Sequence, residues 1–181
     1  MGYVFYTKPS AKPISYSATL RDTKDIMYIV VHATGNKTDT AKGNANYYAT
    51  SNTRKAGANL FIDDTSVCQS IVPSKVAYAV GGNKYADCEK TGGGKMYRKC
   101  TNANSISVEL CSTDGKPSEK TLENAVIVIC DLMKKYHIPS NRVIMHFDVT
   151  GKHCPYWNGW WNNGHKEWYK FKKRILDNGK V

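Results

Sequence analysis

Residues 27–32 read MYIVVH, a short apolar run rich in β-branched side chains that ends in a histidine. A run of this kind is typical of a central strand that is buried on both faces of a sheet. The segment SISVELC at 105–111 has the same character, and RVIMH at 142–146 again ends in a histidine. These three stretches predict a mostly buried β-sheet.

Helical patterns alternate with these strands. Ser118 is a suitable N-cap for a helix in which apolar residues recur every three or four positions from Leu122 to Tyr136. A short helix is expected within 44–52, and a last helix from about Asn163 to Leu176, with Trp168, Phe171 and Ile175 directed inward. Strands interleaved with helices predict an α/β fold.

The rest of the chain is expected to be less regular. Residues 1–24 are polar and interrupted by prolines, which predicts an irregular lead-in. ANLFIDD (58–64), VCQSIV (67–72) and KVAYAV (75–80) predict three strands spaced like a meander, and the Gly-, Lys- and Asn-rich residues 81–104 predict a long surface loop. A length of 181 residues without repeats or a linker indicates one domain, residues 1–181.

The charge balance favours an anionic partner. Lys and Arg number 26 against 15 Asp and Glu, which gives a net charge of +11. Nucleic acid, an anionic membrane surface and an anionic cell wall would all suit this field. The basic residues are scattered, and the one dense run, 170–174, is typical of a solvated helix face. The chain contains no apolar stretch long enough to span a membrane, and residues 1–13 do not have the pattern of a signal peptide.

Six cysteines without a CxxC pair do not by themselves indicate an oxidising compartment. Cys111 and Cys130 lie in apolar patterns and are expected to be buried thiols. Cys88 and Cys100 flank the glycine-rich part of residues 81–104 and can be either bridged or free. Cys154 alone lies in a setting that suggests chemistry.

His32 and His146 each end a predicted buried strand, where a side chain can leave the core while its backbone is held rigidly. Eight residues after His146, the turn in HFDVTGKHCP can bring the Cys154 sulfur back to the same strand end. Two imidazoles and a thiolate suit Zn²⁺, and three protein ligands leave a fourth position for water. The alternative for each histidine is a hydrogen-bonded packing residue.

Two further residues suit hydrolysis at such a site. Glu109 interrupts an apolar strand and is a candidate base for the attacking water; taken without the other residues, a Glu on the solvated face of an edge strand is the simpler interpretation. Lys152 can stabilise the oxyanion that forms when a carbonyl is attacked, or it can be an ordinary turn lysine.

Neighbouring residues have simpler interpretations. Adjacent side chains diverge, so only one of His153 and Cys154 is expected to face the metal. Asp63 and Asp64 are expected in a turn at a strand end. The tryptophans of PYWNGWWNNG form either a groove wall or part of the core.

Together IVVHATGN, the stretch ANLFIDDTSVCQSIVPSKVAYAVG, TNANSISVELC and HFDVTGKHCP resemble the zinc-dependent N-acetylmuramoyl-L-alanine amidases of the type-2 amidase family, especially phage endolysin and autolysin domains. The resemblance covers roughly residues 25–176 and implies a mixed central sheet with helices on both faces and the metal at the edge of a shallow groove. It also implies one zinc ion on His32, His146 and Cys154, with Glu109 and Lys152 as catalytic residues.

The reaction that the resemblance implies is hydrolysis of the amide between N-acetylmuramic acid and L-alanine in the peptidoglycan of Gram-positive walls. A weakly catalytic peptidoglycan-binding module and a zinc peptidase acting on stem peptides are the alternatives. Anionic wall polymers are expected as further partners, whereas nucleic-acid binding and membrane insertion are not. No separate wall-binding domain is evident, and we expect synthesis in the host cytoplasm and action on the wall after release.

The chain also departs from the family pattern at two places. Many relatives have histidine where Asn59 and Ala79 stand here. Neither position is expected to bind the metal.

Overall fold

The protein is described by a computed structural model that covers residues 2–179. Its strands are β1 (Val4–Tyr6), β2 (Tyr16–Leu20), β3 (Tyr28–Ala33), β4 (Leu60–Ile62), β5 (Ser66–Gln69), β6 (Lys75–Ala77), β7 (Ser105–Leu110) and β8 (Val143–Met145). Its α-helices are α1 (Ala41–Thr50), α2 (Cys88–Thr91), α3 (Glu119–Tyr136), α4 (His146–Thr150) and α5 (Lys166–Asn178).

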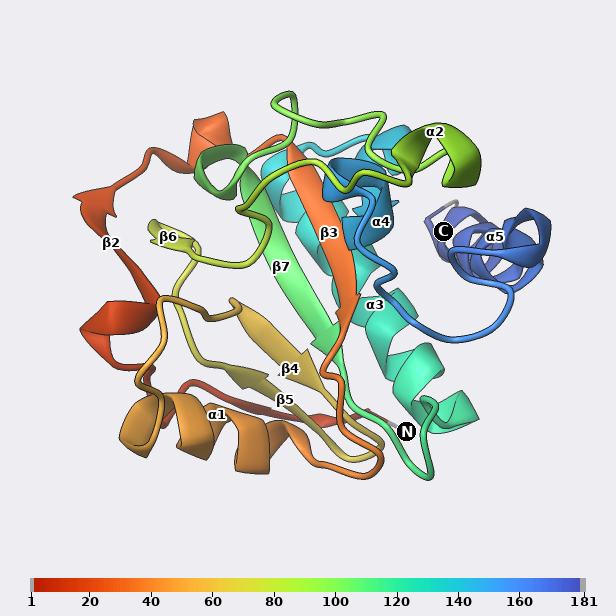
Figure 1. The fold of residues 1–181 in the computed structure, drawn as a ribbon. Coiled ribbons are helices and arrows are strands. Elements are labelled where there is room, and N and C mark those ends of the chain that lie inside the picture. The colour runs from red at the N-terminus through yellow and green to blue at the C-terminus, as the bar shows by residue number, and fades with distance from the viewer. Residues whose placement is uncertain (1, 180–181) are drawn as a thin grey trace.

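Six strands form the central sheet in the order β1-β5-β4-β7-β3-β8 (Figure 1). β4 and β5 are antiparallel, and the other neighbours are parallel. Ile29, Val30 and Val31 of β3 have no exposed surface, as expected for a strand covered on both faces. The sheet is therefore mixed, and the expected α/β class is confirmed.

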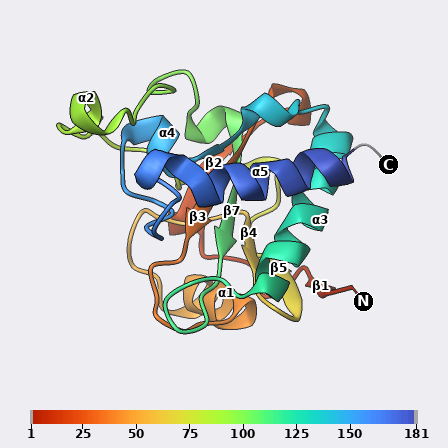
Figure 2. The same cartoon turned by 90° about the vertical axis from the view of Figure 1, so that its right-hand side faces the viewer.

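Helices cover both faces of this sheet. In Figure 1, α3 passes behind β3 and β7, and Figure 2 shows α5 crossing α3 on that outer side. The core of this layer includes Ile129 of α3 and Ile175 of α5. On the other face, α1 packs near β4 and β5, and Val149 of α4 packs against Val30. Within residues 2–179, none of the helices is long and apolar enough to cross a bilayer.

The N-terminal residues are more ordered than the sequence predicts. β1 joins the sheet beside β5, and β2 pairs with β6 in a separate two-stranded sheet. The expected irregular lead-in over 1–24 is therefore wrong, and so is the three-strand meander, because β6 leaves the central sheet after the β4–β5 hairpin. Strands this short gain their stability from tertiary pairing, which a local pattern does not reveal.

Residues 81–104 also pack more closely than a surface loop. They contain α2 and a 3-10 helix, and Cys88 and Cys100 are buried within them. Both cysteines are free thiols. Their sulfurs are held in different surroundings, because Cys88 faces Thr150 whereas Cys100 packs beside Tyr28 and Val30.

The expected helices are present. The Ser118 side chain accepts a hydrogen bond from the Thr121 amide and so caps α3, as predicted. Trp168, Phe171 and Ile175 are the buried residues of α5. His146 is the first residue of α4 rather than the last residue of a strand, because β8 ends one residue earlier.

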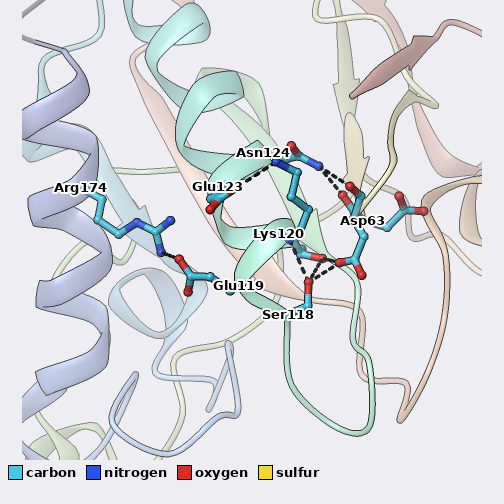
Figure 3. A network of polar contacts seen from close by, with 9 residues as sticks. Asp63, Ser118, Glu119, Lys120, Glu123, Asn124 and Arg174 are labelled. Atoms are coloured by element: carbon cyan, nitrogen blue, oxygen red, sulfur yellow. Dashed lines mark hydrogen bonds and ion pairs between the residues drawn. The ribbon is translucent and has the colours of Figure 1, made fainter. Parts of the chain in front are cut away.

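The Asp63–Asp64 turn connects β4 to two helices. The Asp63 carboxylate accepts hydrogen bonds from the Ala41 amide at the start of α1 (2.8 Å) and from the Thr65 and Ser66 amides. Figure 3 shows the polar network at the start of α3, where Asn124 donates to the carbonyl oxygens of Asp63 and Asp64. The pair is thus a structural turn, as the sequence predicts.

Asp63→Asn is expected to destabilise the protein by about 2–3 kcal/mol at pH 7, because an amide nitrogen would face backbone N–H donors. Burial raises the pKa of the Asp63 carboxyl, but hydrogen bonds from the Ala41, Thr65 and Ser66 amides outweigh burial and bring the pKa below its usual value. The stabilisation is therefore present above about pH 4 and is lost as the pH falls through the lowered pKa. Urea unfolding of both proteins between pH 7 and pH 2.5 measures the difference.

Asp64→Asn is the matched control. Asp64 accepts hydrogen bonds from the hydroxyls of Ser118 and Thr121, which can rotate to suit an amide. Its expected cost is below about 1 kcal/mol. Equal losses in the two variants would contradict this account of Asp63.

Candidate metal and catalytic site

Three neighbouring parallel strands bring the candidate residues together. In the β3–β8 pair Val31 lies opposite Met145, so His32 and His146 occupy the next position on each chain. In the β3–β7 pair His32 lies directly opposite Glu109. The carboxyl ends of parallel strands are where α/β sheets place ligands, and here they carry two imidazoles and a carboxylate.

The turn after α4 adds a sulfur to this strand end. One ligand atom from each of His32, His146 and Cys154 lies within 4.8 Å of the others. The Cys154 Sγ is 3.9 Å from the His32 Nδ1, and the two imidazole centroids are 4.7 Å apart. All three side chains are buried. The structure therefore places the three predicted ligands in one cluster.

The two imidazoles are held neutral. Burial, together with the positive charge of Lys152, lowers the pKa of His146 to about 3. Burial, with His146 and Lys152, lowers the pKa of His32 well below its usual value. Within residues 2–179, neither ring nitrogen of His146 has a hydrogen-bond partner, and the Nε2 of His32 has none. Buried lone pairs without a partner are costly unless a ligand satisfies them, so this donor set fits a metal ion.

The Cys154 thiol also suits a metal ion. Burial, followed by the negative charge of Glu109, raises the pKa of this thiol to about 12. The Ala33 amide donates to its Sγ at 3.4 Å and so favours the thiolate. A bound cation would deprotonate the thiol, as metals do when thiolates coordinate them.

Glu109 lies in the middle of the sheet rather than on an edge strand, which excludes the interpretation of a solvated edge residue. Its side chain is 18% exposed, and its Oε1 is 3.9 Å from the His32 Nδ1. Burial raises its pKa to about 7, with Lys152 acting against the rise and Asp39 adding to it. Its Oε2 has no hydrogen-bond partner within residues 2–179. This carboxyl can both accept and release a proton near neutral pH.

Lys152 is exposed on the turn between α4 and Cys154. Its positive charge acts on the pKa of both histidines and of Glu109, so it lies within electrostatic reach of the site. Of the neighbours His153 and Cys154, the sequence predicts that only one faces the metal. In the structure Cys154 lies in the cluster, whereas the His153 ring stacks on Trp161.

The aromatic segment contributes mostly to the core. Trp157 and Trp160 are buried, whereas Trp161 is half-buried against His153. Trp157 and Trp160 also line a pocket of about 520 Å³ together with Tyr156, so they contribute both to the core and to a pocket wall. Their burial explains why so many aromatics occur in a polar stretch.

A groove beside the site was not predicted from the sequence. It has a volume of about 640 Å³ and runs from Thr34, just after β3, along α1 to Arg54. Asp39 and Tyr48 line this groove and interact electrostatically with Glu109. Thr40, Gly43, Asn44, Tyr47 and Tyr48 recur at helical spacing on one side of α1, but a mixed polar and aromatic helix face does not by itself indicate a groove.

Asn59, one of the two positions where the chain is expected to depart from the family pattern, has a structural role. It has no exposed surface. Its side chain accepts from the Ser107 amide and donates to the Ile71 carbonyl oxygen, which ties β7 to the chain after β5. Asn59 is not one of the three clustered residues His32, His146 and Cys154.

Comparison with known proteins identifies the family. The model of the N-acetylmuramoyl-L-alanine amidase family matches residues 22–157. The amidase CwlL of Bacillus licheniformis is 31% identical over 124 residues, which are 67% of this chain and 32% of that protein. CwlH of Bacillus subtilis is 31% identical over 142 residues, 75% of this chain and 51% of that protein. This chain belongs to the N-acetylmuramoyl-L-alanine amidase family.

Solved structures agree with the sequence comparison. The structure of PlyL has a TM-score of 0.72 and 28% identity, with 97% of each chain covered. The PlyG catalytic domain has a TM-score of 0.71 and 27% identity, covering 99% of this chain and 96% of that one. The chain spans about a third of CwlL and half of CwlH, whereas it spans almost all of these two solved structures.

Proposed function

We propose that this chain hydrolyses the amide bond between the lactyl group of N-acetylmuramic acid and L-alanine in peptidoglycan, with one zinc ion on His32, His146 and Cys154. The observation that carries the proposal is the convergence of two neutral imidazoles, a thiol and a proton-accepting carboxyl at one strand end. Membership of the amidase family gives the substrate class.

The donor set favours zinc over harder cations. Two nitrogens and one sulfur suit Zn²⁺, whereas Mg²⁺ and Ca²⁺ prefer oxygen ligands. When bound, zinc supplies a Lewis acid that polarises a carbonyl oxygen and a water molecule. The remaining chemistry belongs to side chains of this protein.

Glu109 is the proposed proton carrier. Its carboxylate takes a proton from the attacking water, and the same carboxyl then gives that proton to the nitrogen of the leaving L-alanine. A pKa of about 7 suits both steps, because the group is neither too weak a base nor too weak an acid near neutral pH. The partnerless Oε2 is the atom available for this transfer.

Lys152 is the proposed electrostatic stabiliser. As the carbonyl carbon becomes tetrahedral, its oxygen gains negative charge, which a nearby ammonium group stabilises. The charge of Lys152 opposes the rise in the pKa of Glu109 and helps to lower the pKa of both histidines, so its field reaches the reacting position.

The groove along α1, with a volume of about 640 Å³, begins at Thr34, two residues after His32, and offers room beside the site for a polymeric substrate. Gram-positive cell wall is the proposed place of action, in keeping with the Bacillus amidases that the chain resembles. The net charge of +11 favours attraction to anionic wall polymers as well.

Mass spectrometry of the fragments released from purified Gram-positive walls tests this function. We expect free stem peptides that begin with L-alanine, lost on treatment with a zinc chelator and restored by added zinc. Fragments cut within the stem peptide would indicate a zinc peptidase instead. Sedimentation with the wall and no release of fragments would indicate a binding module.

A further inference from the structure

The segment 81–104 lies directly on the part of the chain that carries two of the proposed ligands. Three of its backbone amides donate to carbonyl oxygens of α4: Tyr85 to Thr150 (2.8 Å), Gly94 to Phe147 (2.9 Å) and Met96 to Asp148 (2.8 Å). α4 begins at His146 and leads into the turn with Lys152 and Cys154. The segment therefore braces the backbone on which the site depends.

The contact is close enough to require glycine. Gly151 adopts a left-handed conformation (φ +84°), and a Cβ there would lie 2.2 Å from the Cys88 Sγ of α2. A Cβ on Gly93 would lie 2.8 Å from the Gly151 Cα. Since such distances are shorter than any van der Waals contact, neither glycine can carry a side chain there: the Gly151 backbone packs against the Cys88 side chain, and the Gly93 backbone packs against that of Gly151.

One side-chain contact extends this brace to the ligand turn itself. His153 stands between Lys152 and Cys154, and its Nε2–H donates to the Asp87 Oδ2 at 3.0 Å. The His153 ring also stacks on Trp161, with centroids 3.6 Å apart and planes 8° from parallel. The ring is thus held by a hydrogen bond from one segment and by an aromatic face from another.

The Asp87 carboxylate makes its side-chain hydrogen bond with His153. Its Oδ1 is buried without a hydrogen-bond partner within residues 2–179, so the bond from His153 is the one that its side chain makes there. Asp87 and His153 are 66 positions apart in the sequence, so their hydrogen bond is a long-range contact between two separate segments. The proposed catalytic steps use neither residue.

We propose that Asp87, His153 and Trp161 form a clamp that positions the turn from Lys152 to Cys154 for metal binding. The inference rests on the proposed function. The turn is tight, since the Cys154 amide donates to the Lys152 carbonyl oxygen at 2.6 Å. Fixing the His153 ring therefore fixes the backbone on both sides of it, and with it the sulfur that lies 3.9 Å from the His32 Nδ1. Metal ligands must be held within about 0.5 Å of the productive geometry, so a contact that fixes this turn favours metal binding.

The test measures zinc affinity by competition with a chromophoric chelator, together with the visible spectrum of the cobalt-substituted protein. Asp87→Ala and His153→Ala are each expected to weaken zinc binding by about 10-fold and to alter the cobalt spectrum. The variant with both substitutions should bind zinc no more weakly than His153→Ala. Once His153 is absent, the hydrogen bond between Asp87 and His153 is already broken. Asp87→Asn should stay close to the unmodified protein, since its amide oxygen still accepts from His153.

Glu89→Ala is the matched control. It removes one exposed acidic group from α2, the short helix that Asp87 directly precedes. Thermal unfolding of the zinc-free proteins shows whether each variant is folded. Asp87→Ala and His153→Ala with the affinity and cobalt spectrum of Glu89→Ala would overturn the clamp, and so would additive losses in the double variant. If the unmodified protein bound no zinc, the proposed function itself would fail, and the clamp with it.

Discussion

Glu109→Gln is expected to lower the rate of amide hydrolysis by about 1000-fold while leaving zinc binding almost unchanged. The amide has nearly the shape of the carboxylate but cannot accept the proton of the attacking water. Glu109 contributes no atom to the cluster of His32, His146 and Cys154, so the metal should still bind. The initial rate at which walls release L-alanine amino groups measures the loss.

Zinc content and thermal unfolding serve as the controls for this variant. A folded Glu109→Gln protein that holds one zinc ion and is nearly inactive would support a role in proton transfer. Retention of more than about a tenth of the activity would contradict that role, since no other carboxyl group within residues 2–179 is placed opposite His32 in the sheet.

Cys154→Ser is expected to weaken zinc binding by about 100-fold or more, and activity should be lost at low zinc concentration. A serine hydroxyl is a much poorer zinc ligand than a thiolate, and it is too short to replace the sulfur. The remaining imidazoles of His32 and His146 would hold the ion alone. Competition with a chromophoric chelator gives the affinity directly.

Cys130→Ser provides the matched substitution. Cys130 is also a buried thiol, but it lies on α3, where its Sγ donates to the Ile175 carbonyl oxygen. The same chemical change there should leave zinc affinity intact. If Cys154→Ser and Cys130→Ser bound zinc equally well, Cys154 would not be a ligand.

Much of the site could be anticipated from local patterns. The run 27–32 is so apolar that it predicts a buried strand, and a histidine at its end is expected where the strand leaves the core. The apolar run 105–111 predicts a strand that carries Glu109, but it leaves open whether that strand lies inside the sheet or at its edge. The direct pairing of Glu109 with His32 is a matter of sheet register, which two separate strand patterns do not specify.

The parts that were missed depend on long-range contacts. β1 has three residues and no distinguishing pattern, and it forms because β5 offers an edge to pair with. Asp87 lies in a segment without periodicity, and its partner His153 is 66 positions away. A sequence can show that such residues are polar, but their partners are set by how the strands and helices pack.

Hydrolysis in water enriched in ¹⁸O tests the central claim most directly. Cleavage of the muramoyl amide places the oxygen of the attacking water in the new lactyl carboxylate, while its proton passes to the new amino group of L-alanine. Mass spectrometry should therefore find one ¹⁸O on the muramic acid product and none in the released stem peptide. Label in a carboxyl group of the peptide, or at the reducing end of a cleaved sugar, would contradict the assignment of this bond.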